Sequence, residues 1–165
     1  EEMLRQKAQL NLVVYVSMGF GNPYNEPWHA KDTALMVERL QDIGVQDIAL
    51  ADTVANANAN RIRQVLELSP KAEHLGLHLH AHPQLWQQQV DAAWDYGIRW
   101  FEGALGGIGG CPFAADALVG NLATESLLPY LAQKGYQALP EMSLLEKLAV
   151  HARDLAHQHR NSDAF

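Results

Sequence analysis

The sequence predicts an α/β fold in which parallel strands alternate with helices. Four short, mostly apolar stretches recur along the 165 residues, and each is followed by a segment whose apolar residues have helical spacing. Repeated strand and helix units are typical of a parallel sheet with crossover helices. With 48% hydrophobic and 19% charged residues, the chain has the composition of one globular domain with a substantial core. We therefore expect one domain over residues 1–165, built as half of an eight-stranded (β/α) barrel.

The expected strands are short and are separated by turn-forming residues. Residues 12–17 form an apolar, largely β-branched run, which is typical of a strand buried on both faces. Glycines, an asparagine and a proline end this run and open a loop that extends to Trp28. By similar patterns, further strands are expected at residues 47–52, 75–80 and 99–104.

Helices are expected where apolar residues recur every three or four positions. Gly44 and Gly97 each follow such a segment, and glycine is favoured directly after the end of a helix. In the last segment the recurring apolar residues predict a buried stripe that includes Leu148 and Leu155. The expected helices cover residues 31–43, 58–68, 84–96, 122–134 and 143–159.

The composition argues against several classes of protein. A net charge of −7 disfavours nucleic-acid binding, and no apolar run reaches the roughly 18 residues of a membrane span. A single cysteine forms no internal disulfide and no signal peptide is evident, which favours a cytoplasmic protein. Residues 1–9 resemble the tail of a helix, so we expect further chain upstream.

Polar residues gather at the expected carboxyl ends of the strands, where (β/α) barrels carry their active residues. His78 and His80 are two apart on one strand, so their side chains would point to one face, about 6–7 Å apart along the backbone, and could converge on one ion. Packed or surface histidines are the alternative. Asp52 ends a buried strand, where a charge needs a partner or a task. A helix cap or an ion pair with Arg61 would also explain it.

A glycine-rich loop follows the fourth expected strand. Four glycines lie within five positions, immediately before Cys111 and Pro112, so the backbone can approach a ligand closely. The alternatives are a plain turn and a small buried cysteine. Asn121 lies just beyond the loop, where it would otherwise cap a helix that begins at Leu122.

These stretches together resemble the 3-hydroxy-3-methylglutaryl-CoA lyases, members of a metal-dependent lyase and synthase superfamily on the TIM barrel. The resemblance is carried by Gly-Gly-Ile-Gly-Gly-Cys-Pro-Phe at 106–113 and Gly-Asn-Leu-Ala-Thr-Glu at 120–125. Segments 15–24, 50–53 and 77–80 match in the same order. The resemblance extends from about residue 12 to about residue 136 and corresponds to the second half of such an enzyme.

The resemblance implies a role for each of these residues. His78, His80 and the side-chain oxygen of Asn121 would bind a metal ion. Cys111 would take part in proton transfer, and Asp52 would act as an acid, a base or an orienting group. Imidazoles alone would allow Zn²⁺ whereas oxygen ligands favour Mg²⁺ or Mn²⁺, and the resemblance also favours Mg²⁺ or Mn²⁺. The substrate-binding residues would be Ser17, Asn22, Thr53, Gly109 and Gly110.

The implied reaction is the retro-Claisen cleavage of 3-hydroxy-3-methylglutaryl-CoA, an acyl-CoA of leucine degradation, into acetyl-CoA and acetoacetate.

Two features depart from the family pattern. Ala81-His82-Pro83 replaces the usual acidic residue and threonine, and the first strand of the family, with its arginine and metal-binding aspartate, has no counterpart. We therefore expect a homodimer, or pairing with an N-terminal half-barrel. The alternatives are a Claisen-type synthase of the same superfamily and an inactive half-barrel.

Overall fold

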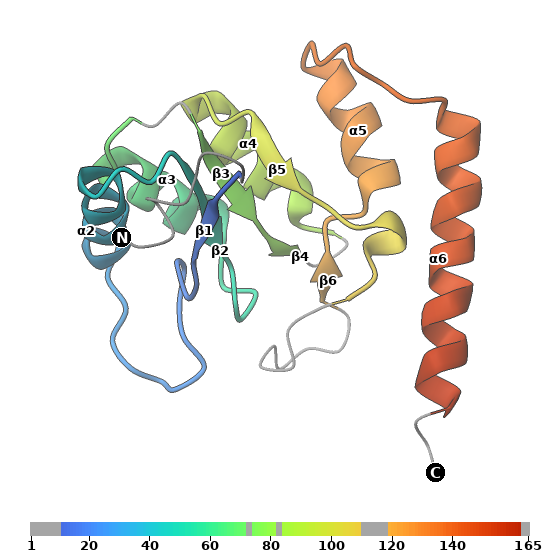
Figure 1. Cartoon of the computed structure of the whole chain (residues 1–165), viewed down its shortest axis with the longest axis horizontal. Helices are drawn as coiled ribbons and strands as arrows, with labels where there is room; N and C mark the ends of the chain where they lie inside the picture. The colour runs from blue at the N-terminus through green and yellow to red at the C-terminus, as the bar shows by residue number, and fades with distance from the viewer. Residues whose placement is uncertain (1–10, 72–73, 82–83, 110–118, 163–165) are drawn as a thin grey trace.

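A computed structural model describes residues 11–71, 74–81, 84–109 and 119–162, with the side chains of residue 81 and residues 159–162 left out. Its centre is a parallel sheet of four strands (Figure 1). The strands lie in the order β1, β2, β3, β5, and every neighbouring pair is parallel. Their bounds are Val13–Val16 for β1, Asp47–Ala51 for β2, Leu75–His78 for β3 and Trp100–Glu102 for β5. The predicted parallel α/β architecture is confirmed.

Three helices connect these strands and bury one face of the sheet. They are α2 (Ala30–Asp42), α3 (Ala59–Leu68) and α4 (Trp86–Tyr96), close to the predicted ranges. The side chain of Asn58 accepts the backbone N–H of Arg61 and so caps α3, and Gly97 ends α4 with a φ of 106°. Alternate strand residues pack with the inner faces of the helices, so the core lies between the two layers. It includes Ile48, Leu50, Leu75, Leu77, Val37, Ile62, Val65 and Val90.

The other face of the sheet carries the intervening residues of each strand. Register places Tyr15 opposite Ala49, and His78 opposite both Ala51 and Glu102. Because side chains alternate along a strand, Tyr15, His78 and Glu102 share the face away from the three connecting helices. In a complete barrel this face is the interior.

The third strand is shorter than expected, because the chain turns out of the sheet after His78. The next residues, His80–Ala81, form β4, which pairs antiparallel with β6 (Gly120–Asn121) in a separate two-stranded sheet. The prediction of one strand over 75–80 is therefore wrong beyond His78. The physical reason is a long-range pairing between β4 and β6, which local hydrophobic pattern does not reveal.

The glycine-rich segment opens with a short 3₁₀ helix, η2 (Leu105–Gly107), and two further helices follow it. These are α5 (Thr124–Gln133) and α6 (Met142–Ser162). Figure 1 shows α6 standing beside α5 and η2, away from the four-stranded sheet. The predicted buried stripe on the last helix is wrong for Leu148 and Leu155, which are about half exposed because α6 contacts η2 and α5 on the side where Ala149 is buried. Among the described residues, no helix is both long enough and apolar enough to cross a bilayer.

Gly76 shows how closely the interior face is packed. A Cβ atom on this residue would overlap the Trp100 ring, which lies against the bare backbone of β3. We expect Gly76→Ala to lower the free energy of unfolding by about 1–3 kcal/mol, because the indole must be displaced. Urea denaturation of the full chain measures this. In a Trp100→Leu background the same substitution should cost less, and an equal cost would contradict the packing explanation.

Candidate functional site

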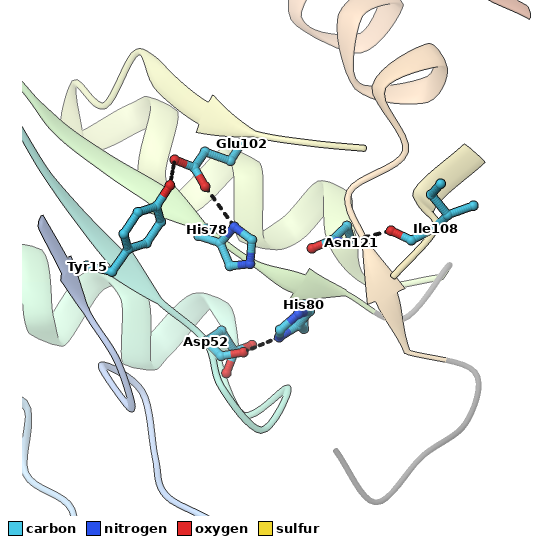
Figure 2. Close-up of polar contacts among 7 residues, drawn as sticks. All are labelled: Tyr15, Asp52, His78, His80, Glu102, Ile108 and Asn121. Atoms are coloured by element: carbon cyan, nitrogen blue, oxygen red, sulfur yellow. Dashed lines mark hydrogen bonds and ion pairs between the residues drawn. The ribbon is translucent and has the colours of Figure 1, made fainter. Parts of the chain in front are cut away.

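The polar residues of the interior face converge at the carboxyl ends of the strands (Figure 2). Asp52 follows β2, His78 ends β3 and Glu102 ends β5, while His80 and Asn121 belong to the small antiparallel sheet. His80 and Asn121 are direct cross-strand partners. The two imidazole rings have centroids 5.3 Å apart and lie nearly perpendicular, at 84°. The fold thus brings both predicted histidines and Asn121 into one cluster.

His78 is held by a carboxylate from the neighbouring strand. Its Nδ1 lies 2.8 Å from Oε2 of Glu102, and the Tyr15 hydroxyl donates to Oε1 of the same carboxylate at 2.7 Å. Because a carboxylate accepts hydrogen bonds, Nδ1 of His78 is the donor, and Nε2 is the ring nitrogen that Glu102 does not engage. The hydrogen bond to Glu102 also raises the pKa of Tyr15, so the phenol stays a donor.

His80 is held by the backbone. Its Nδ1 lies 2.5 Å from the carbonyl oxygen of Asp52, and since a carbonyl only accepts, this nitrogen is the donor. Burial lowers the pKa of His80, which keeps the ring neutral near pH 7. Its Nε2, like that of His78, has no hydrogen-bond partner among the described residues.

Asn121 is oriented by the glycine-rich segment. Its Nδ2 donates to the carbonyl oxygen of Ile108 at 2.9 Å. The amide oxygen is turned the other way, toward the His78 ring (Figure 2). Asn121 lies in β6, and α5 begins only at Thr124 with Ala123 as its cap, so the alternative of a helix cap is wrong.

Close backbone contacts explain why glycines are needed beside this cluster. Gly109 has a φ of 86°, and a Cβ atom there would lie 2.9 Å from Nδ2 of Asn121. A Cβ atom on Gly120 would lie 2.5 Å from the carbonyl oxygen of Gly107. Larger residues would therefore push the segment away from β6. Glu125 secures its start, since this carboxylate accepts from the Gly106 N–H and pairs with Arg153 of α6 at 2.8 Å.

The Asp52 carboxylate is fully buried and organises the loop that follows β2. Its oxygens accept the backbone N–H groups of Asn56 and Ala57 at 2.8 and 3.1 Å. Arg61 instead donates to the carbonyl oxygen of Phe20, so the predicted ion pair is replaced by contacts to the backbone. Burial raises the pKa of Asp52 to about 6, although the two N–H groups oppose the shift.

Ser17, Asn22 and Thr53 lie in the loops that follow β1 and β2. Asn22 is engaged in its own turn, where its side-chain oxygen accepts from Tyr24 and Glu26. Thr53 accepts the Met18 N–H, which joins the loops after β1 and β2. Ser17 is exposed at the start of the first of these loops. Gly110 and Cys111 lie outside the described residues.

The donor atoms of the cluster fit a metal ion. Ligating histidines commonly donate one ring N–H to a carboxylate or a backbone carbonyl and bind metal through the other nitrogen, and His78 and His80 show these two arrangements. Asn121 adds an amide oxygen that accepts no hydrogen bond from any other residue the structure describes. Within the described ranges, no three histidine, cysteine, aspartate or glutamate side chains are grouped to share an ion. The candidate ligands are therefore two imidazoles and one amide.

Sequence analysis did not single out Glu102 or Tyr15. Glu102 lies near the carboxyl end of the strand expected at 99–104, so a charged residue near a strand end was a usable signal. Tyr15 gave no such signal, because it lies within an apolar run predicted to be buried on both faces. It is in fact 49% exposed and reaches Glu102 across the sheet.

Known proteins with similar sequences act on acyl-CoA compounds. A hydroxymethylglutaryl-CoA lyase of Bacillus subtilis is 34% identical over 131 residues, which are 78% of this chain and 44% of that protein. The (R)-citramalyl-CoA lyase of Chloroflexus aurantiacus is 38% identical over 123 residues, which are 72% of this chain and 38% of that protein. The chain is a relative of the hydroxymethylglutaryl-CoA lyases. No family model matches the sequence.

Solved structures of hydroxymethylglutaryl-CoA lyases share the fold. A crystal structure from Bacillus subtilis superposes with a TM-score of 0.82 at 29% identity and covers 93% of this chain and 52% of that chain. A lyase of Acinetobacter baumannii in complex with coenzyme A and 3-methylmalate superposes with a TM-score of 0.73 at 33% identity, over 90% of this chain and 48% of that chain. The chain therefore spans about half the length of these lyases, and the predicted half-barrel is confirmed.

The buried carboxyl of Asp52 makes stability depend on pH. The pKa of Asp52 is raised from 3.8 to about 6 on folding, so protonation of this carboxyl stabilises the folded state. This stabilisation is complete below the unfolded-state pKa of 3.8 and is lost as the pH rises through the folded-state pKa of about 6. Relative to Asp52→Asn, we expect the free energy of unfolding of the wild-type chain to fall by roughly 2 kcal/mol between pH 4 and pH 7.5. Urea denaturation across this range measures the difference. Parallel curves for the two proteins would contradict the raised pKa.

Proposed function

We propose that this chain carries part of the active site of a carbon–carbon lyase that cleaves 3-hydroxy-3-methylglutaryl-CoA into acetyl-CoA and acetoacetate. The observation that carries the proposal is the cluster of His78, His80 and Asn121 at the carboxyl ends of the strands, where each side chain has one polar atom that no other described residue engages. Similarity to lyases of hydroxymethylglutaryl-CoA and citramalyl-CoA supports the substrate class.

The three side chains would hold Mg²⁺ or Mn²⁺ through Nε2 of each histidine and the amide oxygen of Asn121. Such a cation, when bound, polarises the hydroxyl and carbonyl oxygens of the substrate. The three ligands are neutral, so an anionic ligand is expected from another half-barrel. Glu102 and the carbonyl oxygens of Asp52 and Ile108 keep the ligand atoms directed into the cluster.

The proposed reaction needs proton transfer at two points. A base takes the proton of the 3-hydroxyl group, the C2–C3 bond breaks as that oxygen becomes the ketone of acetoacetate, and the electron pair remains on the acetyl-CoA enolate. An acid then protonates the enolate carbon. We assign these transfers to Cys111 and Asp52. A pKa of about 6 suits Asp52 to exchange protons near neutral pH.

Exclusion of water protects the enolate until it is protonated. We propose that the glycine-rich segment from Leu105 onward serves this purpose, together with the loops that contain Ser17, Asn22 and Thr53. Ile108 of this segment already contacts the cluster, because its carbonyl oxygen accepts from the side chain of Asn121. Gly109 allows the contact because it has no Cβ atom.

Pairing with a second half-barrel is the oligomeric state we propose. In the described sheet β1 and β5 are the outer strands, and each has a strand partner on one side only. A second copy, or an N-terminal half-barrel, would cover these edges. Light scattering at micromolar concentration should give the mass of a dimer for the purified chain, and a monodisperse monomer would contradict self-pairing.

Acetoacetate release from 3-hydroxy-3-methylglutaryl-CoA tests the proposed reaction. We expect release by the full chain to require Mn²⁺, to fall roughly 100-fold or more in His80→Gln because a ligand is lost, and to fall in Cys111→Ala. His74→Gln is the matched control, since His74 is an exposed histidine that contacts Asp47 at the far end of the strands.

The second candidate substrate is citramalyl-CoA, favoured by the 38% identity to the Chloroflexus enzyme. Release of acetyl-CoA from citramalyl-CoA, with no cleavage of 3-hydroxy-3-methylglutaryl-CoA, would select this candidate. Condensation of acetyl-CoA with a 2-oxo acid would instead indicate a Claisen-type synthase. No turnover of any of these compounds at saturating Mn²⁺, by the chain alone, would contradict an autonomous lyase and favour an inactive half-barrel.

A further inference from the structure

Tyr15 and Glu102 form a bridge over the interior face of the sheet. They lie on β1 and β5, the outer strands, with β2 and β3 between them. Three inter-strand spacings amount to about 14 Å in a flat sheet. The Tyr15 hydroxyl nevertheless lies 2.7 Å from Oε1 of Glu102, because both side chains extend over the strands between them (Figure 2).

We propose that Glu102, held in place by Tyr15, is the positioning residue that directs Nε2 of His78 into the ligand cluster. The inference rests on the proposed function, since it concerns how one of the proposed ligands is oriented. Both oxygens of the carboxylate are used, Oε1 by Tyr15 and Oε2 by Nδ1 of His78. The carboxylate therefore has little freedom to rotate away from the imidazole.

His78 depends on this carboxylate more than the other two proposed ligands depend on any one side chain. His80 and Asn121 are each oriented by a backbone carbonyl, whose position the sheet and the loop determine. The anchor of His78 is a side chain on the next strand, and the side chains of both residues are partly exposed, at 30% and 24%. Without the carboxylate, the ring could turn over and exchange its two nitrogens, or carry its proton on Nε2.

The same contacts could serve stability alone, by joining the first and last strands. The two roles differ in what they predict for the imidazole. A purely structural bridge leaves the protonated nitrogen of His78 unchanged when Glu102 is replaced by a neutral residue of the same shape. A positioning residue selects the Nδ1–H form, and its loss allows the Nε2–H form, in which Nε2 has no lone pair to offer a metal ion.

Glu102→Gln is the test variant, and Asp47→Asn is its matched control. Asp47 also contacts Nδ1 of a histidine, His74, at 3.3 Å, but this pair lies at the opposite end of the strands. Long-range ¹H–¹⁵N correlation spectra of the metal-free full chain at pH 8 report which nitrogen of each histidine carries the proton. Loss of signals in His78→Gln assigns those of His78. Titration with MnCl₂, followed by electron paramagnetic resonance of free Mn²⁺, gives the affinity.

We expect the Nδ1–H form of His78 in the wild-type chain and in Asp47→Asn, and a shift toward the Nε2–H form in Glu102→Gln. Mn²⁺ affinity should fall between tenfold and 100-fold in Glu102→Gln. Tyr15→Phe, which leaves the carboxylate without its second donor, should cause a smaller fall. Thermal unfolding of each variant shows whether the fold is retained.

An unchanged His78 proton position in a folded Glu102→Gln variant would overturn the inference, whatever the Mn²⁺ affinity. A shifted proton position with no Mn²⁺ binding by the wild-type chain would support the positioning role and contradict metal binding by this chain without an N-terminal half-barrel. The two failures are therefore distinguishable.

Discussion

The hydrogen bond between Tyr15 and Glu102 is the contact on which the arrangement of the interior face depends. It joins the outer strands over β2 and β3, and curvature like that of a barrel wall shortens the distance that the two side chains must cross. A hydrogen bond to a charged group contributes about 1.5–3 kcal/mol when shielded and less where water competes. The bond thus favours the curved form, while the core beneath the sheet supplies most of the stability.

Two further orienting contacts come from the backbone. The carbonyl oxygens of Asp52 and Ile108 each accept from a side chain of the cluster and do not engage its second polar atom. The backbone N–H groups of both residues are themselves hydrogen-bonded, to the carbonyl oxygens of His78 and Leu105. The two acceptors are therefore positioned by the backbone, and no side chain has to be ordered to provide them. The cluster is therefore prepared by the fold itself, a requirement for any site that must bind an ion without first rearranging.

Asp52 contacts both the loop that follows β2 and the ring of His80. Its oxygens hold the Asn56 and Ala57 N–H groups, and its own carbonyl holds His80. Any movement of this loop on proton binding would therefore reach the ring of His80. Asp52, which the sequence analysis identified as a charged residue at the end of a buried strand, thus fixes the loop through its side chain and orients His80 through its backbone carbonyl.

The sequence by itself determined the parallel α/β order, the helix ends at Asn58 and Gly97, and the histidines as candidates, since each follows from local spacing or from a strong residue preference. The pairing of β4 with β6, the reach of Tyr15 to Glu102, and the backbone acceptors for His80 and Asn121 were decided only by tertiary structure. These contacts join residues far apart in the chain, and local pattern carries no information about which distant backbone or side-chain group will lie within hydrogen-bonding distance.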